Sequence, residues 1–398
     1  MNPGIYLKKG REASLGRFHP WVFSGAVARI EGNPSEGSVV TVYSSQGEVL
    51  ACGHFQIGSI AVRILSFGTE TLPEGFWENS VRNAVRMRMR LGLMGAEGTD
   101  CCRLIHGEGD MLPGLVVDWY GGVCVMQAHS AGMFMAKDEI AKALKTVLGD
   151  RLAAIYDKSS QTAPHKAGLA LEDGYVYEAP GFVRGCRTVV ENGNPFAVDW
   201  EGGQKTGFFL DQRDNRALAG RLSAGRNVLN LFCYTGGFSV YALRGGARHV
   251  TSVDSSAKAV EMLRKNVELS GFGDDVHEAV CGDAIDYLKS VRTGEYDLMI
   301  VDPPAFAKHR GAIDNAVRAY TRLNEAAISK VASGGFILTF SCSQTVDKET
   351  FALAVFTAAA HTGRRVRILG RLTQPADHAV NIYHPEGEYL KGMLLYIE

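Results

Sequence analysis

Residues 227–247 read NVLNLFCYTGGFSVYALRGGA, and this stretch decides the fold. It starts as an apolar strand, turns at Gly236 and Gly237, and continues with a helical pattern. Strand, glycine turn and helix, in this order, present backbone N–H groups to a nucleotide in α/β proteins. The G-x-G-x-x-G spacing of dinucleotide enzymes is missing, which argues against a nicotinamide cofactor. A glycine pair taken alone is often a plain turn, so the prediction depends on the ends of the neighbouring strands.

Two acidic residues stand at the ends of the next two predicted strands. HVTSVD ends at Asp254, where a carboxylate can accept both hydroxyls of a ribose. HEAVCGDA places Asp283 just after the third strand, where it could accept from the adenine amino group. Either acid could instead be a helix N-cap. Two acids beside a glycine turn predict an adenosine site in a doubly wound α/β domain.

The fourth and fifth strands end in residues that can do chemistry. YDLMIVDPPAF ends in Asp302, Pro303 and Pro304, and two prolines stiffen the backbone where a planar base would lie. GGFILTFSCSQTV ends at Cys342, at the same edge of a parallel sheet. A plain Pro-Pro turn and a buried, inert thiol are the structural alternatives.

Cys342 is the candidate nucleophile of a pyrimidine methylation. Carbon 5 of a pyrimidine attacks a methyl sulfonium only after a thiolate has added to carbon 6. A carboxylic acid near ring nitrogen 3, here Asp302, would stabilise the charge that develops during this addition. Cys233 adjoins the glycine turn and Cys281 falls within a strand, so both are expected to pack in the core.

The strand ends together resemble the class I methyltransferase fold over roughly residues 194–398. In that fold RVRILGRLTQ and GEYLKGMLLYIE would be the sixth and seventh strands. The resemblance implies S-adenosylmethionine as the cofactor. The cofactor site it implies consists of Asn230, Tyr234, Thr235, Gly236, Asp254, Asp283 and Asp302.

Longer motifs resemble one family, the ribosomal RNA large-subunit methyltransferase I family. They are FFLDQRDNR, LNLFCYTGGFSVYA, DPPAF and LTFSCS, and the resemblance covers the whole chain. LKKGREASLGRFHPWVFSGAV resembles the family's amino-terminal PUA domain, an RNA-binding β-barrel, and RLIHGEGDMLPGLVVDWYGG resembles its central domain. The resemblance implies formation of 5-methylcytosine in large-subunit ribosomal RNA.

One departure concerns release of the product. Related RNA cytosine enzymes with two cysteines carry one directly after the proline of the fourth-strand motif, whereas this chain has Pro304 and Ala305 there. Another base, water or a carboxylate, must then remove the carbon 5 proton.

The predicted organisation has three domains. Short alternating runs such as SVVTVY and SIAVRILSF predict a small β-barrel or sandwich over residues 1–70, and the resemblance implies that it is the PUA-like domain. Mixed strands and one helix predict a central α+β domain over 71–190, and the methyltransferase domain takes 191–398.

Substrate contacts are expected from basic and aromatic side chains. Lys205 and Arg213, with Arg216 nearby, could hold phosphate or the methionine carboxylate, or form surface salt bridges; Pro303 and Pro304 would line the base. His378 and the following YHPEGEYLKG lie on a connection that could close over the base, or are structural. Trp21 could stack on a nucleotide or belong to a barrel core.

Composition limits the class of protein. The 398 residues, 46% of them hydrophobic, suit two or three soluble domains, and no apolar run approaches the ~18 residues of a membrane span. The eight cysteines lack Cys-x-x-Cys spacing, which favours a reducing cytoplasm and predicts no metal. A net charge of -1 means that ribosomal RNA must be bound by local patches, and we expect a monomer or homodimer.

Two other functions compete with cytosine carbon 5 methylation. Asp302-Pro303-Pro304 resembles the motif of enzymes that methylate exocyclic amines of cytosine or adenine, although Ala305 here separates the prolines from Phe306. The other alternative is an RNA-binding assembly factor that keeps the cofactor fold without turnover.

Overall fold

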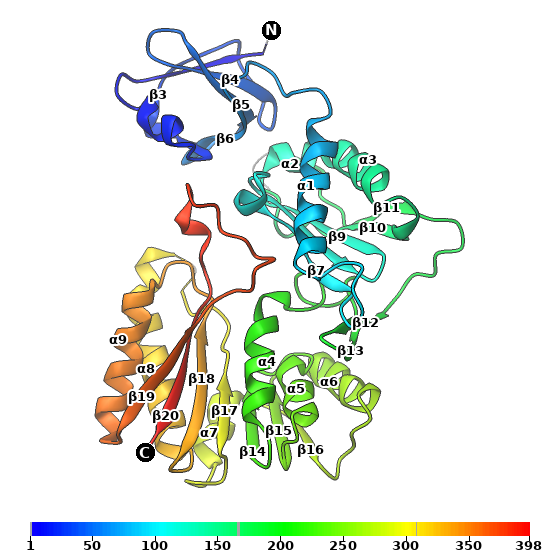
Figure 1. Ribbon diagram of the computed structural model, residues 1–398. Helices are drawn as coiled ribbons and strands as arrows, with labels where there is room; N and C mark the ends of the chain where they lie inside the picture. The colour runs from blue at the N-terminus through cyan, green and yellow to red at the C-terminus, as the bar shows by residue number, and fades with distance from the viewer. Residues whose placement is uncertain (1, 165–167, 308) are drawn as a thin grey trace. The chain divides into compact units, whose positions relative to one another are not determined.

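The computed structural model describes residues 2–164, 168–307 and 309–398 (Figure 1). The chain forms two compact units. Unit 1 consists of Met1–Val189, Val198–Leu210 and Ala376–Gly387; unit 2 consists of Val190–Ala197, Asp211–Pro375 and Glu388–Glu398. The predicted domains follow the sequence in contiguous blocks, whereas these units do not. Among the described residues no helix is both long and apolar enough to cross a membrane.

Unit 1 begins with a six-stranded sheet in the order β2-β6-β5-β4-β1-β3. β1 pairs parallel with β4 and antiparallel with β3. Alternating apolar residues such as Val40, Val42 and Val62 form its core. The elements are β1 (Gly4–Leu7), η1 (Glu12–Arg17), β2 (Trp21–Phe23), η2 (Ser24–Ala26), β3 (Val27–Glu31), β4 (Val39–Tyr43), β5 (Val49–Phe55) and β6 (Ile60–Phe67).

The second sheet of unit 1 has five strands in the order β11-β10-β9-β8-β7. Val81 of α1 and Ile140 and Leu144 of α3 belong to the same buried cluster as the strands, so these helices cover the sheet. The elements are α1 (Phe76–Arg90), β7 (Cys101–His106), η3 (Gly107–Asp110), β8 (Leu115–Tyr120), β9 (Val123–Ala128), α2 (Ala131–Met135), α3 (Lys137–Leu148), η4 (Gly149–Arg151), β10 (Ala154–Asp157) and β11 (Gly174–Glu178).

Residues 376–387 belong to unit 1 although they follow β19 in the sequence. Arg88 of α1 is fully buried and donates to the carbonyl of Asp377 at 2.6 Å. The Asp377 carboxylate accepts the backbone N–H of Arg103 at 2.9 Å. Buried polar groups need such partners, and these bonds attach the segment to the helix and to β7.

Unit 2 is a doubly wound α/β domain with a seven-stranded sheet, as the sequence predicts. The strand order is β16-β15-β14-β17-β18-β20-β19, and β20 runs antiparallel to both of its neighbours. The strands are β14 (Asn227–Leu231), β15 (His249–Asp254), β16 (His277–Cys281), β17 (Leu298–Val301), β18 (Gly335–Ser341), β19 (Val366–Leu372) and β20 (Lys391–Ile397). The two last predicted strands, β19 and β20, form an edge pair of this sheet.

Helices cover both faces of this sheet (Figure 1). On one side lie α4 (Arg213–Leu222), α5 (Gly237–Arg244) and α6 (Ala257–Leu269); on the other lie α7 (Ala284–Ser290), α8 (Ile313–Lys330) and α9 (Lys348–Thr362). Leu323 of α8 and Phe351 of α9 share a core with Met299 and Ile337 of the sheet. The remaining elements are β12 (Arg187–Glu191), β13 (Asn194–Val198), η6 (Leu210–Gln212), η7 (Arg310–Ala312) and η8 (Pro385–Gly387).

The register of the parallel strands collects the candidate residues at one edge of the sheet. Leu231 of β14 pairs with Val253 of β15 and with Val301 of β17, and Val301 pairs with Thr339 of β18. The next residues along these strands include Asp254, Asp302 and, slightly further on, Cys342. We call this edge, where the parallel strands end, the carboxyl edge. Ligands of open α/β sheets bind there.

Candidate active site

The glycine turn after β14 is held tightly against α6. Tyr234 and Gly236 have positive φ angles of 47° and 83°, and a Cβ on Gly236 would lie 2.2 Å from Cδ1 of Leu263. Glycine is favoured at this position because its φ is positive and because a Cβ would push the Leu263 side chain aside. Asn266 of α6 donates to the carbonyl of Thr235 at 2.8 Å. The sequence does not single out Asn266, because one polar residue in an amphipathic helix is ordinary.

Asp254 fastens the same turn. Its Oδ2 accepts the backbone N–H of Tyr234 at 2.8 Å, and its Oδ1 accepts that of Ser256 at 2.9 Å. Asp283 caps α7, because its Oδ1 accepts the N–H groups of Ile285 and Asp286 at 2.8 and 2.9 Å. The N-cap alternative thus holds for Asp283. Asp254 and Asp283 present carboxylate acceptors beside a positive-φ turn, and the hydroxyl and amino groups of an adenosine are donors, so the residues present fit the cofactor.

Asn230 lies inside β14 and is 1% exposed. Its Nδ2 donates to Oγ of Ser239 at 2.8 Å, and Ser239 bonds Ser252 of β15 at 2.7 Å. The Oδ1 atom of Asn230 is buried without a hydrogen-bond partner among the described residues. The side chain therefore joins α5 to the sheet behind the turn, and its contact with the cofactor stays a prediction.

The charges of Cys342 and Asp302 both affect the phenol hydroxyl of Tyr320, in α8. Ser341 donates to the hydroxyl of Tyr320 at 2.9 Å. Burial, with a contribution from negative charge on Cys342 and Asp302, raises the pKa of Tyr320 to about 12.

The segments after Asp302 and Cys342 are bonded to each other. Ser343 donates to the carbonyl of Ala307 at 2.6 Å. Pro303 is buried and Pro304 is exposed. The ring of Phe306 packs 4.8 Å from that of Tyr320, in the core beneath α8. Phe306 is therefore engaged in packing, while the two prolines stiffen the chain that follows β17.

Asp302 and Cys342 have further partners that the sequence did not reveal. Gln212 donates from Nε2 to Oδ2 of Asp302 at 3.0 Å. Lys391, at the start of β20, is 6% exposed and donates to the carbonyls of Ser343 and Tyr389. Burial lowers the pKa of Lys391 to about 8, against the attraction of a negative charge on Cys342. That attraction is mutual, so a cationic Lys391 stabilises a thiolate at Cys342.

Arg213 does not offer its guanidinium group to RNA at the surface. Its side chain is 3% exposed, and its Nε lies 3.4 Å from the carboxylate of Glu191, which is itself fully buried. Arg216 donates to the same carboxylate at 2.9 and 2.7 Å. The position of Arg213 thus does not support the predicted substrate contact, and the salt bridge is buried rather than on the surface. Lys205, in unit 1, is exposed, with its Nζ 4.5 Å from the centroid of the Phe209 ring.

The other two cysteines of the methyltransferase domain differ from each other. Cys233 is buried, and burial together with the charge of Asp254 holds its pKa far above the usual range, so it remains a thiol. Cys281 is the last residue of β16 and is exposed. The predicted packing role is therefore wrong for Cys281, because this residue lies at the exposed end of its strand.

Trp21 and His378 both lie in unit 1. Trp21 donates from Nε1 to Glu108 at 2.8 Å, and its ring lies 4.3 Å from that of His384. His378 is 1% exposed, and its Nδ1 lies 3.3 Å from the Asp377 carboxylate. Both side chains have protein partners within their own unit.

Comparison with known proteins identifies the family. A model described as S-adenosylmethionine-dependent methyltransferase matches residues 102–379, and a PUA-like domain model matches 5–67. The chain is 40% identical over 403 residues to the ribosomal RNA large subunit methyltransferase I of Aeromonas hydrophila, and the match covers 99% of both proteins. It is 40% identical over 395 residues to the protein of the same name from Klebsiella pneumoniae, covering 98% and 97%.

Solved structures share the fold. A methyltransferase complexed with SAH matches with a TM-score of 0.84 at 23% identity, over 99% of each chain. An S-adenosylmethionine-dependent methyltransferase from Streptococcus mutans matches with a TM-score of 0.83 at 23% identity, again over 99% of each chain. With these matches, the chain belongs to the ribosomal RNA large subunit methyltransferase I family of S-adenosylmethionine-dependent methyltransferases.

Proposed function

We propose that this protein methylates carbon 5 of a cytosine in large-subunit ribosomal RNA, with Cys342 as the nucleophile. The observation that carries the proposal is the arrangement at the carboxyl edge. Cys342 follows β18, Asp302 directly follows the neighbouring β17, and the buried Lys391 donates to the carbonyl of Ser343, the residue next to Cys342. The relatives that match the whole chain are named as ribosomal RNA methyltransferases, which supports the substrate class.

The residues of the chain divide the reaction between them. When bound, S-adenosylmethionine would supply the methyl group and leave as S-adenosylhomocysteine. The Cys342 thiolate would add to carbon 6 of the cytosine, which makes carbon 5 nucleophilic toward that methyl group. A base then takes the carbon 5 proton, the carbon–sulfur bond breaks, and the thiolate is restored. Lys391 stabilises the thiolate before and after the cycle, and Asp302, held by Gln212, hydrogen-bonds near ring nitrogen 3.

The cofactor is assigned to the glycine turn and the neighbouring strand ends. Asp254 would accept the ribose hydroxyls and Asp283 the adenine amino group, with Asp302 closing the site beside the methyl group. Asn230, Tyr234, Thr235 and Gly236 would shape the pocket for the methionine part. This assignment is supported by the two carboxylate acceptors, Asp254 and Asp283, and by the positive-φ turn, which together fit an adenosine.

RNA contacts are assigned to the PUA-like domain and to the rim of the base site. Pro303 and Pro304 would lie against the target base, because they are the rigid continuation of β17. Lys205 is exposed and could reach a phosphate.

The test compares Cys342→Ala with Cys281→Ala, which removes an exposed cysteine of the same unit. Labelled methyl transfer to unmodified ribosomal RNA is measured, and the product nucleoside is identified by mass spectrometry. We expect Cys342→Ala to lose at least about 1,000-fold in rate, as removal of a nucleophile does elsewhere. Cys281→Ala should retain the activity of the wild type and yield 5-methylcytosine. An active Cys342→Ala enzyme would refute the covalent mechanism.

The amine-methylating alternative predicts a different result. It needs no covalent adduct, so Cys342→Ala would remain active and the product would be an N-methylated base. The packing of Phe306 against Tyr320 speaks against it, because an aromatic side chain is then not free to stack on the base. An assembly factor without turnover would bind RNA but transfer no methyl group in the wild type.

A further inference from the structure

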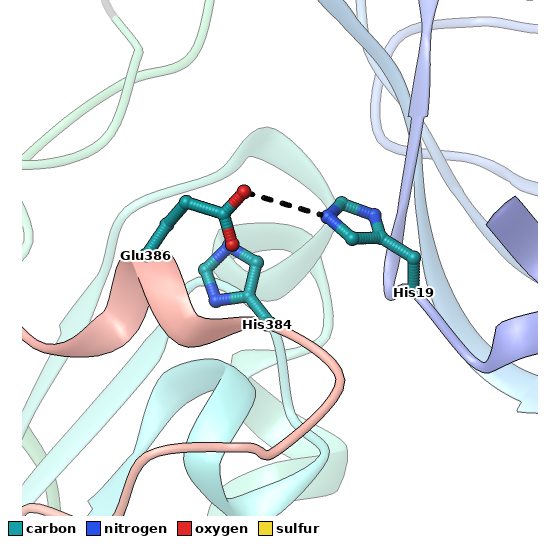
Figure 2. A group of neighbouring side chains, drawn as sticks. All are labelled: His19, His384 and Glu386. Carbon is teal, nitrogen blue, oxygen red and sulfur yellow. Dashed lines mark ion pairs between the residues drawn. The ribbon is translucent and has the colours of Figure 1, made fainter.

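Three side chains of unit 1 converge outside the methyltransferase site (Figure 2). His19 lies between η1 and β2. Glu386 lies in η8, and His384 directly precedes η8. Figure 2 shows Glu386 facing both imidazole rings. Sequence reasoning finds no such group, because His19 belongs to the first β-sheet and the other two residues to the segment after β19.

The distances within this group suit a bound metal ion. Nε2 of His19 lies 3.9 Å from Oε1 of Glu386, and Nε2 of His384 lies 3.9 Å from Oε2 of Glu386. The three candidate ligand atoms all lie within 4.8 Å of one another. Zinc bonds of about 2.0–2.1 Å in a tetrahedral site separate the ligand atoms by about 3.4 Å. Small rotations of side chains would therefore close the group around an ion.

Among the described residues, no hydrogen bond accounts for the burial of the His384 ring. Its side chain is 4% exposed, and neither ring nitrogen has a hydrogen-bond partner there. Buried polar atoms are normally paired, so an unpaired imidazole aimed at a carboxylate and a second imidazole needs a ligand. The ring is held in place by Trp21, whose centroid lies 4.3 Å away and whose Nε1 is engaged by Glu108.

His19 is held in place by a neighbouring residue in the chain. Its Nδ1 accepts the backbone N–H of Trp21 at 3.2 Å and lies 3.3 Å from the carbonyl oxygen of the same residue. These contacts orient the ring so that Nε2 faces Glu386, 3.9 Å away.

We propose that His19, His384 and Glu386 bind a divalent transition-metal ion of the zinc type. Two imidazoles and one carboxylate are a known ligand set for Zn²⁺, and a water molecule would complete the coordination. The ion would fasten the segment around η8 to the first β-sheet within unit 1. None of the three residues is part of the proposed methyl transfer mechanism.

The test uses the full-length, untagged protein after treatment with a chelator and dialysis. Co²⁺ is titrated in and followed by its visible absorption, and Zn²⁺ is titrated by calorimetry. We expect a single saturable site in the wild type. His384→Gln should weaken binding of Co²⁺ at least about 100-fold, the upper range for loss of a group that merely supports a ligand. His361→Gln, which alters an exposed histidine paired with Glu325, should bind like the wild type.

A second variant protects the test against misfolding. Glu386 is 58% exposed, so Glu386→Gln should fold normally while also weakening the binding of Co²⁺. Zn²⁺ should raise the melting temperature of the wild type but not of Glu386→Gln, because only a ligand that binds the folded state stabilises it. Wild-type protein that gives no saturable absorption, or equal affinity in wild type and Glu386→Gln, would overturn the proposal.

Discussion

Lys391 stands at the first position of β20, in a place where a lysine is costly. Its ammonium group is removed from water, and burial lowers its pKa to about 8. Asp347 and Glu388 act to retain the charge, and Lys348 opposes it. The carbonyls of Ser343 and Tyr389 satisfy two of its three donors. Burying a lysine beside Cys342 carries this desolvation cost, and stabilisation of the Cys342 thiolate is the best explanation for it.

The pH profile of Lys391→Met tests this role. Below about pH 8 the wild type carries the cation beside Cys342, and above it the cation is lost. We therefore expect the variant to be about tenfold slower at pH 7, equivalent to roughly 1.4 kcal/mol of lost thiolate stabilisation. The difference should shrink as the pH rises above 8, because the wild type then loses its cation and more of the variant's thiol ionises. Initial rates of methyl transfer measure this difference, with Lys289→Met as the control, because Lys289 is an exposed lysine of the same unit. A rate ratio independent of pH would mean that Lys391 is only structural.

At the scale of secondary-structure elements, Glu191 joins the ribbon of β12 and β13 to α4. It is the last residue of β12, is fully buried, and faces the guanidinium groups of Arg213 and Arg216. Tyr241 of α5 also donates to its carboxylate, at 3.0 Å. One anion thus holds together three elements that precede or follow the first strand of the methyltransferase sheet.

Replacing Glu191 by Gln should destabilise unit 2 strongly. The substitution leaves two buried guanidinium groups without their anion, and breaking a buried pair in this way costs about 3–5 kcal/mol. Urea unfolding followed by circular dichroism measures the loss. Glu178→Gln is the matched control, because Glu178 pairs with an exposed Arg184 and its removal should cost far less. Similar losses in both variants would show that Glu191 is not an anchor.

At the scale of the whole molecule, buried neutral histidines make stability depend on pH. His54 is 4% exposed and His277 is 3% exposed, and burial lowers the pKa of each to about 4. In the unfolded chain a histidine titrates near pH 6.5. Between these two values the unfolded state binds more protons than the folded state. The stability contributed by the neutral ring is therefore complete above about pH 6.5 and is lost as the pH falls toward 4.

We expect the free energy of unfolding to fall between pH 7 and pH 5, with each of these histidines costing about 2 kcal/mol at pH 5. Urea midpoints at the two pH values measure the change. His277→Gln should lose less stability over this interval than the wild type, whereas the exposed His361→Gln should match the wild type. If His277→Gln showed the full pH dependence of the wild type, protonation of His277 would not contribute to acid sensitivity.

The methyltransferase sheet and its carboxyl edge were predictable from the sequence for a local reason. Each strand is a short apolar run bounded by turn residues, and parallel strands joined by right-handed crossovers end at one edge. Asp254, Asp302 and Cys342 follow such runs, so their shared location follows from connectivity alone. The sequence could not show that the Arg213 side chain is buried. A basic residue before a strand looks the same in the sequence whether it faces solvent or a buried carboxylate.

The sequence by itself thus determined the α/β fold, the strand ends and the family. Only the tertiary structure decided which polar residues are buried and what they pair with, as in Lys391 beside Cys342. It also brought His19 and His384 together from opposite ends of the chain. The physical reason is that the desolvation and pairing of a side chain depend on residues remote in sequence, and no local pattern records them.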